Sequence, residues 1–365
     1  MTRTGRPTAP ATARPTGSRT AAQAEPDRED TERQRILALL DRASYAGIRD
    51  VLAGGHDANL SSCTAAGRLL GLLPDMPYRA QDALAFAEHA VTVLVRDLGV
   101  RQIIHTDHGF PHYAPRRNVH EIAQTIDPAC RTVYADADPV VHARARCVLT
   151  GSDRVAVADM GLASGVHRVL EHPAVAAHLD QARPVAVLCT AVEAVPDTVT
   201  SALTADLARL LPAGGYLAVC QLTVEDTHLA RQVDEVMATA LDGRWDRLRT
   251  PAQTAGLLRD LPLVQQLGVV EAPHYIRSSY RPAGPPRAAV LGAIARITPS
   301  GPSPTASPPR RAGTPPSSST EAWSASPGRT PALTPDLGGP NPALPPRAAD
   351  SRPHSNRDHI RLEHP

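Results

Sequence analysis

The chain of 365 residues is long enough for one large domain or two small ones. Its formal net charge is +1 and its pI is near 7.8, so it lacks the basic excess typical of nucleic-acid-binding proteins. No apolar run approaches the roughly 18 residues of a membrane span, and the arginine-containing N-terminus has no apolar core of a secretory signal. These features predict a cytoplasmic protein that uses neither nucleic acid nor a membrane as a partner.

Five cysteines are dispersed along the chain without a C-x-x-C pair. An odd, dispersed set favours reduced thiols over a disulfide framework or a zinc site. We therefore expect a reducing compartment and no bound metal.

Both ends of the chain have a composition typical of disorder. Residues 1–30 are rich in Thr, Pro, Ala and Arg, and residues 299–365 in Pro, Ser, Thr, Arg and Gly. Such segments bury too little apolar surface to offset the entropy cost of ordering. We predict a single domain over 31–298 between two disordered tails. Polyproline segments in the second tail leave open a protein partner, with an inert tail as the alternative.

Residues 31–98 have helical periodicity and form an expected N-terminal helical cap. Gly54 and Gly55 interrupt it and are followed by polar residues that include Asp57. Glycines allow positive φ and a close backbone approach to a ligand. A helix end followed by a new helix is the alternative interpretation.

The stretch from Val100 to Asp159 organises the rest of the chain. Its apolar runs VRQIIH, RTVYAD and RVAVAD are separated by two helical stretches. Near-continuous apolar strands that alternate with helices indicate a parallel sheet covered on both faces. Ligands in such sheets bind beyond the carboxyl ends of the strands.

Polar residues gather where these strands are expected to end. The first strand leads into HTDHG (105–109), the second ends at Asp136, and the third at Asp159. An acid after the second strand can accept hydrogen bonds from ribose hydroxyls, and one after the third from an adenine amino group. The centre of the chain therefore predicts a nucleoside-binding site.

The remaining α/β core, which begins at residue 99, predicts four more strands. RPVAVLCT ends in Thr190, YLAVCQLT follows, and segments 264–273 and 287–297 close the sheet as an antiparallel edge pair. Asn118 is expected to cap the helix after the first strand, Asp138 with Pro139 to begin the next, Asp197 to cap a third, and Thr250 with Pro251 to begin a fourth. The prediction is a Rossmann-like α/β fold of about seven strands, mostly parallel.

Five ordered segments carry a family resemblance. GIRDVLAGGHDAN is similar to RVYDYLLGGKDNF, and RQIIHTDHGFPH followed by NVHEIAQ is similar to RQFLDIGTGLPT followed by NVHEVAQ. VYADADPVV is similar to VYVDNDPVV, and ADM and RPVAVLCTAVEAVPD complete the set. From about residue 44 to 297 the chain resembles the actinobacterial S-adenosyl-L-methionine-dependent methyltransferase family, formerly a domain of unknown function.

The resemblance implies a class I methyltransferase sheet with S-adenosyl-L-methionine at its carboxyl edge. By analogy, Asp136 holds the ribose hydroxyls, Asp159 the adenine amine, and the loop around Gly109 faces the methionine portion. The implied cofactor-binding residues are Gly54, Gly55, Asp57, His105, Asp107, Gly109, Asp136, Ala137, Asp159, Met160 and Thr190.

The chain departs from the family pattern at the expected site. His105 replaces the acid of the D-x-G-x-G loop, Asp107 replaces its first glycine, and His56 replaces a lysine. The histidine that precedes VPD in the family is absent, although Glu193 lies nearby. Either Asp107 replaces the missing acid in a retuned site, or the site no longer binds the cofactor.

Three functions follow from these patterns. The first is methyl transfer to an unidentified, small-molecule acceptor. The second is a non-catalytic family member with a regulatory or partner-binding role. The third, a nicotinamide-dependent oxidoreductase, is disfavoured because the chain lacks G-x-G-x-x-G.

No catalytic base can be assigned from the sequence. His108, His112, Tyr113 and Glu193 are candidates, and each residue type also occurs commonly in loops and on surfaces. His105 and His108 lack a third metal ligand at an expected spacing, so no metal site is predicted.

Overall fold

The computed structural model describes residues 31, 33–34, 37–113, 116–264, 270–271 and 287–299. The tails predicted for 1–30 and 299–365 lie outside the described residues, apart from Pro299. The described residues fall within one compact unit.

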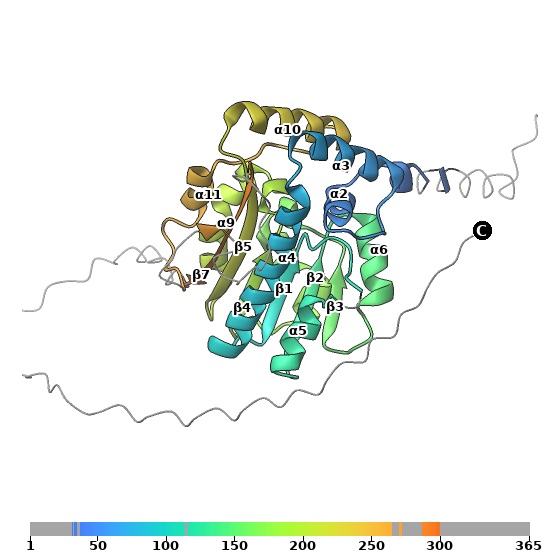
Figure 1. The fold of residues 1–365 in the computed structure, drawn as a ribbon. Helices are drawn as coiled ribbons and strands as arrows, with labels where there is room; N and C mark the ends of the chain where they lie inside the picture. The colour runs from blue at the N-terminus through green and yellow to red at the C-terminus, as the bar shows by residue number, and fades with distance from the viewer. Residues whose placement is uncertain are drawn as a thin grey trace, which may run out of the picture. The chain divides into compact units, whose positions relative to one another are not determined.

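A seven-stranded sheet forms the centre of the fold (Figure 1). The spatial order is β3-β2-β1-β4-β5-β7-β6, in which β1 to β5 are parallel and β7 runs antiparallel to both β5 and β6. This confirms the predicted α/β class and the antiparallel edge pair. The strands are β1 (Gln102–Thr106), β2 (Arg131–Ala135), β3 (Val155–Ala158), β4 (Val185–Cys189), β5 (Gly215–Thr223), β6 (Val270–Glu271) and β7 (Ala289–Ile297).

The strand order reverses on either side of β1. β2 and β3 extend the sheet in one direction, and β4, β5, β7 and β6 extend it in the other. In register, His105 lies opposite Tyr134 of β2 and Leu188 of β4. The carboxyl ends of β1, β2 and β4 therefore meet at a topological switch point, the place where open α/β sheets bind ligands.

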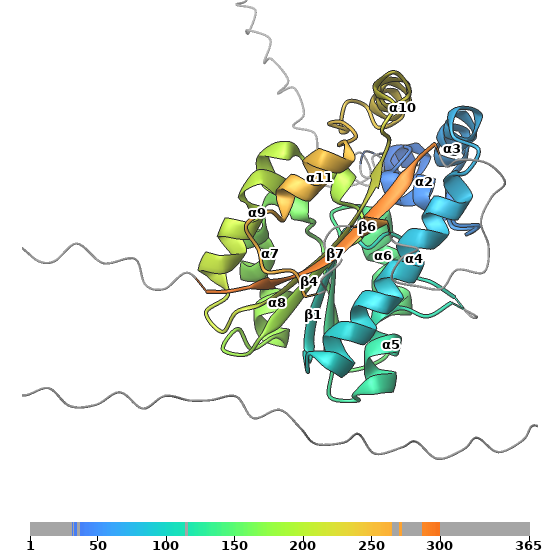
Figure 2. The same ribbon diagram turned by 60° about the vertical axis from the view of Figure 1, so that its left-hand side comes forward.

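Helices cover both faces of the sheet. Figure 2 shows α4 and α5 on one side of the strands and α7, α8 and α9 on the other. The helix bounds are α2 (Tyr45–Leu52), α3 (Leu60–Leu72), α4 (Met76–Thr92), α5 (Val119–Ile126), α6 (Pro139–Val148), α7 (Val166–Glu171), α8 (Pro173–His178), α9 (Asp197–Leu210), α10 (Thr227–Ala240) and α11 (Pro251–Leu257).

Each face of the sheet has its own apolar core. Ile103 and Leu188 pack with the core that includes α4, α5 and α10, whereas Ile104 and Val187 pack with the core that includes α7 and α9. Successive strand residues point to opposite faces, so uninterrupted apolar strands supply both cores. This is the physical reason for the apolar runs in the sequence.

Helices α2, α3 and α10 gather above the carboxyl edge of the sheet (Figure 1). α3 contacts both of the others. Helix α4 instead lies along the sheet against β5 and β7. Its Phe86 ring occupies the position where a side chain at Gly292 would project, so the missing Cβ permits this close packing.

Most predicted helix boundaries are confirmed. Asn118 forms a capping box with Glu121, Asp138 caps α6, and Thr250 forms a capping box with Gln253. Helix α4 lies within the helical stretch predicted over 31–98 and passes at Val93–Asp97 into a π-helical turn. Of the strand predicted at 264–273, the described part is β6.

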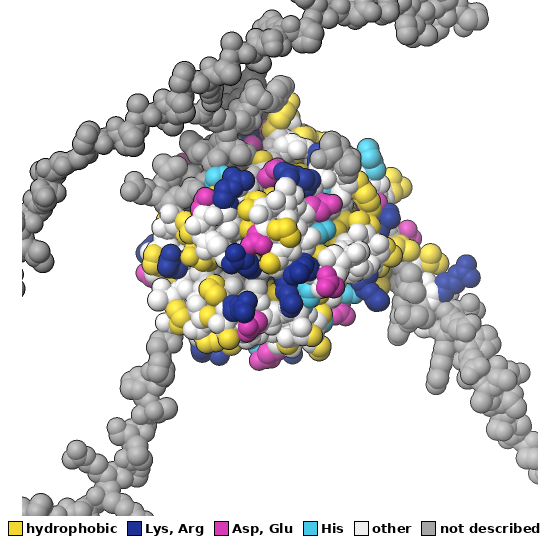
Figure 3. Space-filling view, turned by 90° about the horizontal axis from the view of Figure 1, so that it is seen from below, with side chains coloured by type: hydrophobic (Ala, Val, Ile, Leu, Met, Phe, Trp, Pro, Cys, Tyr) yellow, Lys and Arg dark blue, Asp and Glu magenta, His cyan; other side chains and the backbone are white. Residues whose placement is uncertain are grey.

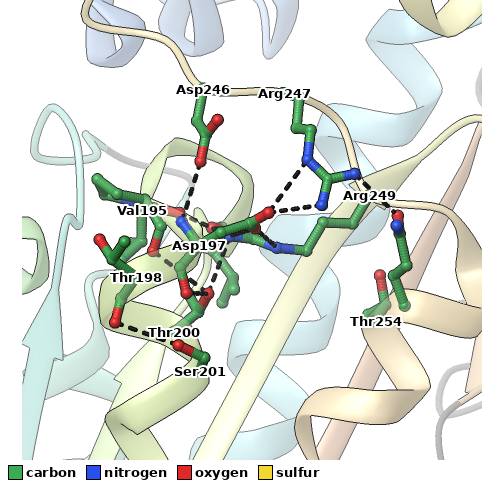
Figure 4. A network of polar contacts seen from close by, with 12 residues as sticks. Val195, Asp197, Thr198, Thr200, Ser201, Asp246, Arg247, Arg249 and Thr254 are labelled. Carbon is green, nitrogen blue, oxygen red and sulfur yellow. Dashed lines mark hydrogen bonds and ion pairs between the residues drawn. The ribbon is translucent and has the colours of Figure 1, made fainter.

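The predicted capping role of Asp197 is wrong. Pro196 is the N-cap of α9, and Asp197 is its first helical residue. Its carboxylate instead accepts hydrogen bonds from Arg247 and Arg249 (Figure 4). A competing long-range ion pair thus determines where this side chain points.

Arg249 ties three segments together beneath α9. Its guanidinium donates to Asp197 at 2.7 Å, to the carbonyl of Val192 at 2.9 Å and to that of Val195 at 2.8 Å (Figure 4). Nη2 also donates to the hydroxyl of Thr200. Arg249 is 3% exposed, so its charge depends on these partners.

Three properties named from composition can be compared with the described residues: the cysteines, the helices and the surface charge. All five cysteines are free, and no described helix has the length and apolarity required to cross a bilayer. Basic and acidic side chains are interspersed on the face shown in Figure 3.

Replacing Arg249 by Met should lower the free energy of unfolding by about 2–4 kcal/mol, because it removes a buried charge from its acceptors. Urea denaturation of the full chain measures this. Arg247→Met is the matched control: Arg247 also pairs with Asp197 but is 46% exposed, so its loss should cost under about 1 kcal/mol. Equal losses in the two variants would contradict the anchoring role of Arg249.

Candidate functional site

Two neighbouring cavities lie at the switch point. The first, here the polar cavity, has a volume of about 210 Å³ and is lined by residues that include Asp107, Asp136 and Ala137. The second, here the apolar cavity, has a volume of about 110 Å³ and extends from His105 toward α4 and α10. Tyr45, Ala46 and Arg49 of α2 line both cavities.

Asp136 projects from the end of β2 and is 7% exposed. Its Oδ1 accepts the backbone N–H of Asp138 at 2.9 Å, and its Oδ2 accepts that of Gly109 at 3.0 Å. These bonds fix the carboxylate between the β1 and β2 loops. Because a carboxylate has about four acceptor positions, each oxygen keeps the capacity to accept another hydrogen bond.

Asp107 follows β1 in a conformation that is uncommon outside glycine, with φ of 49°. Its Oδ2 accepts the backbone N–H of Leu162 at 3.0 Å. A Cβ placed on Gly161 would lie 2.5 Å from Oδ1 of Asp107. The side chain thus bridges the loops that follow β1 and β3, and Gly161 leaves room for it.

The two carboxylates share a poorly solvated site. Burial raises the pKa of Asp107 to about 6, opposed by the hydrogen bond from Leu162. Burial, together with the negative charge of Asp107, raises the pKa of Asp136 to about 7. Near neutral pH, the polar cavity therefore carries less negative charge than two ionised carboxylates would supply.

Arg49 separates the two cavities. Its guanidinium donates to the hydroxyl of Thr190 at 3.2 Å and to the backbone carbonyl of Asp107 at 3.3 Å. It also lies 5.9 Å from the centre of the Tyr45 ring. Tyr45 and Arg49 are four residues apart on α2, so they project from the same side of the helix.

A buried tyrosine–glutamate pair lies beside this boundary. The hydroxyl of Tyr45 donates to Oε1 of Glu193, whose Oε2 accepts the backbone N–H of Leu222 at 3.3 Å. Burial raises the pKa of Glu193, with the positive charge of Arg49 opposing it. Glu193, in the loop after β4, is thus held by hydrogen bonds from α2 and β5.

Histidine rings line one end of the apolar cavity. The centroids of His105 and His108 are 5.8 Å apart, and the Tyr134 ring lies 5.0 Å from His108. Burial lowers the pKa of His108 to about 3 and that of His105 well below its ordinary value. Both imidazoles are therefore neutral at physiological pH. No group of three potential metal ligands occurs among the described residues.

The structure brings part of the predicted residue set together. His105, Gly109 and Thr190 line the apolar cavity, and Asp107, Asp136 and Ala137 line the polar one. Of the sequence candidates for a base, His108, His112 and Glu193 line the apolar cavity, whereas Tyr113 is 52% exposed.

The other predicted contacts lie outside both linings. Gly54 has a positive φ of 78° and follows α2 directly, as the helix-end interpretation expects. Asp57 accepts a hydrogen bond from Arg144 at 2.6 Å. Asp159 is 71% exposed and bonded to His172, and Met160 follows it. The cofactor contacts assigned to Gly54, Gly55, Asp57, Asp159 and Met160 remain predictions.

Sequence reasoning missed Tyr45, Arg49 and Trp245 as cavity residues. Their positions along the chain gave no sign that α2 and the segment after α10 meet at one site. The available signal was the pair Tyr45 and Arg49 at helical spacing in an otherwise small and apolar segment.

Comparisons with known proteins agree with this architecture. A crystal structure from Thermobifida fusca YX, described provisionally as a methyltransferase, superposes with a TM-score of 0.61 at 23% identity, covering 71% of this chain and 96% of that one. A DUF574 family protein from Streptomyces avermitilis MA-4680 has the same TM-score at 28% identity, covering 71% and 98%. No curated protein matches the chain.

The family assignment comes from a sequence model. The model described as S-adenosyl methyltransferase matches residues 30–298, which is most of the chain and includes both cavities. The predicted resemblance is therefore confirmed, and the chain belongs to the S-adenosyl methyltransferase family.

Proposed function

We propose that the protein transfers a methyl group from S-adenosyl-L-methionine to a small-molecule acceptor. The polar cavity takes the nucleoside portion of the donor, and the adjoining apolar cavity takes the acceptor. The observation that carries this proposal is the position of Asp136. It lies at the end of β2, beside the switch point, with acceptor capacity left on both oxygens.

The residues of the polar cavity fit a ribose. Two adjacent hydroxyls require two acceptors at fixed separation, and backbone N–H groups hold the two oxygens of Asp136 in place. Ala137, which follows it, presents only a methyl group to the same cavity. A hydrogen bond to the ionised form of Asp136, whose pKa is about 7, contributes about 1.5–3 kcal/mol.

When bound, S-adenosyl-L-methionine supplies a methyl group already activated on a sulfonium. The chain's own residues then have to orient the acceptor and exclude water. Apolar side chains of α2, α4 and α10 do so in the second cavity, and Arg49 with Tyr45 forms its boundary with the first. If the acceptor is protonated, Glu193 and the histidines of that cavity, His105, His108 and His112, are among the groups able to receive a proton.

A non-catalytic role is the second candidate, and Asp107 is the observation that favours it. Its side chain extends from the loop after β1 and accepts a hydrogen bond from the backbone N–H of Leu162. The family pattern has a glycine at this position, which would leave the backbone open to a ligand. A protein that retains the fold but not donor binding would serve as a regulatory or partner-binding member.

Asp136→Ala should weaken binding of S-adenosylhomocysteine by the full chain at least tenfold, because each tenfold corresponds to about 1.4 kcal/mol. Isothermal titration calorimetry at one pH measures this. Asp180→Ala is the control: Asp180 is an exposed carboxylate that precedes β4, at the opposite edge of the sheet, and its loss should leave affinity unchanged.

The same titration decides between the two functions. If the native chain is folded and neither S-adenosylmethionine nor S-adenosylhomocysteine binds, the methyltransferase proposal is wrong and the non-catalytic role replaces it. Asp159→Ala in this assay tests the adenine contact that the family resemblance implies.

Asp107→Asn should raise the free energy of unfolding at pH 7.5 by on the order of 1–2 kcal/mol, and at pH 4.5 by roughly a third as much. The carboxyl has a pKa of about 6 in the folded chain and about 3.9 when unfolded. The folded state therefore binds more protons between these values, and stability falls as pH rises through them. Asparagine removes this penalty and retains an oxygen for the Leu162 N–H.

Urea denaturation of both proteins at the two pH values tests this. An equal increase in the free energy of unfolding at pH 4.5 and pH 7.5 would show that ionisation of Asp107 does not destabilise the folded chain.

A further inference from the structure

The apolar cavity differs from the polar cavity in the chemistry of its walls. Its walls come largely from apolar side chains of three helices and the segment after α10, among them Leu52, Ala83, Val233, Met237, Trp245 and Leu248. An apolar cavity of about 150 Å³ can hold a benzene molecule. At about 110 Å³ this cavity is in the range of a single ring.

Two buried imidazoles interrupt this apolar lining at the β1 end. His105 and His108 are each 7% exposed. Nδ1 of His105 and Nε2 of His108 are buried without a hydrogen-bond partner, while Nε2 of His105 lies 3.4 Å from the hydroxyl of Thr190. A buried nitrogen left unpaired costs free energy, and both residues line the cavity. Neither nitrogen presents accessible surface to the cavity in this ring orientation, so a ligand hydroxyl pairs with one only after a small rotation of the ring, and that pairing would remove the cost.

We propose that this cavity binds a neutral, largely apolar single-ring compound whose hydroxyl group is held by His108 and His105. The identification of this compound as the methyl acceptor rests on the proposed function. The preference of the cavity for such a compound is independent of that function.

The charge state of the histidines determines which group they favour. Burial holds both rings in the neutral form, and the positive charge of Arg49 opposes protonation further. A neutral imidazole has one donor and one acceptor nitrogen, which matches a hydroxyl. It offers no net charge to compensate a buried carboxylate or ammonium.

The charged side chains of the cavity already have partners, including Asp50, which accepts the backbone N–H of Asp57 at 2.9 Å. Arg79 pairs with Asp82 at 3.0 Å, and Arg116 donates to the carbonyl of Ala53. Glu193 accepts from Tyr45 and from the backbone of Leu222. Arg49 is the competing anchor for an anionic ligand, but its guanidinium lies at the boundary and donates to Thr190 and the Asp107 carbonyl.

Three probes of one shape test the proposal: 4-methylphenol, toluene and 4-methylbenzoate. The full chain carries Trp323→Phe, so that Trp245, in the cavity wall, is the remaining tryptophan. Its fluorescence reports occupancy, and calorimetry gives the dissociation constants. We expect 4-methylphenol to bind about tenfold more tightly than toluene, the gain from one hydrogen bond, and 4-methylbenzoate to bind more weakly than 4-methylphenol.

His108→Leu should reduce the preference for 4-methylphenol over toluene to within about threefold, and His108→Gln, which keeps polar atoms there, should retain more of it. The matched control is His142→Leu. His142 also has a buried nitrogen without a partner, but it lies in α6 and lines neither cavity, so the preference should persist.

Equal binding of 4-methylphenol and toluene would overturn the proposal, as would the absence of binding by any probe or an unchanged preference in His108→Leu. Tightest binding of 4-methylbenzoate would overturn it in favour of an anion held by Arg49. If the 4-methylphenol preference holds but S-adenosylhomocysteine does not bind, the cavity chemistry stands and methyl transfer fails. If S-adenosylhomocysteine binds but 4-methylphenol is not preferred over toluene, methyl transfer stands and a single-ring hydroxyl compound is rejected as the acceptor.

Discussion

The reversal of strand order beside β1 is the constraint on which the rest of the structure depends. Parallel strands deliver all their carboxyl ends to one edge of the sheet, and the reversal separates the connections that follow β1 and β4. Backbone groups left at this edge need partners. The loops supply them through side chains: Asp136 accepts two backbone N–H groups and Asp107 a third. The residues that build the loops are therefore also those that face the cavities.

Desolvation gives the two cavities a common electrostatic character. It raises the pKa of Asp107 and Asp136 and lowers that of His105 and His108. In each case burial favours the neutral form. Charge on these four side chains is thus suppressed, and the guanidinium of Arg49 is the charged group that lines both cavities. A cation in the polar cavity would lower the pKa of both carboxyls and release protons, so its affinity would increase with pH.

The sequence predicted the features whose causes are local. Apolar runs identified the central strands, because a strand buried on both faces requires them, and Asp138 with Pro139 marked the start of α6. The place of Asp136 in the lining of the polar cavity followed from its position at a strand end. Such signals lie within a few residues of the element that they specify.

The remaining features arise from residues that are distant in the sequence. Arg249 recruits Asp197 as an ion-pair partner, and this interaction overrides the predicted cap. The apolar cavity forms only when Tyr45, Glu193 and Trp245 converge, and no periodicity relates those positions. Asp159 also follows a strand, and its exposed carboxylate pairs with His172; its contact with adenine stays a prediction. The direction of a side chain after a strand depends on its neighbours in space.

Position 107 shows how one substitution can support two opposite functional outcomes. Glycine adopts positive φ without steric cost, whereas aspartate is among the few other residues that tolerate it. The chain keeps the turn at φ 49° and gains a carboxylate one residue beyond Thr106, the last residue of β1. That carboxylate can supply the acid lost at His105, or it can occupy the space a ligand needs. Its bond to the Leu162 N–H decides between them, because a ligand that displaces this bond must replace it with one at least as favourable.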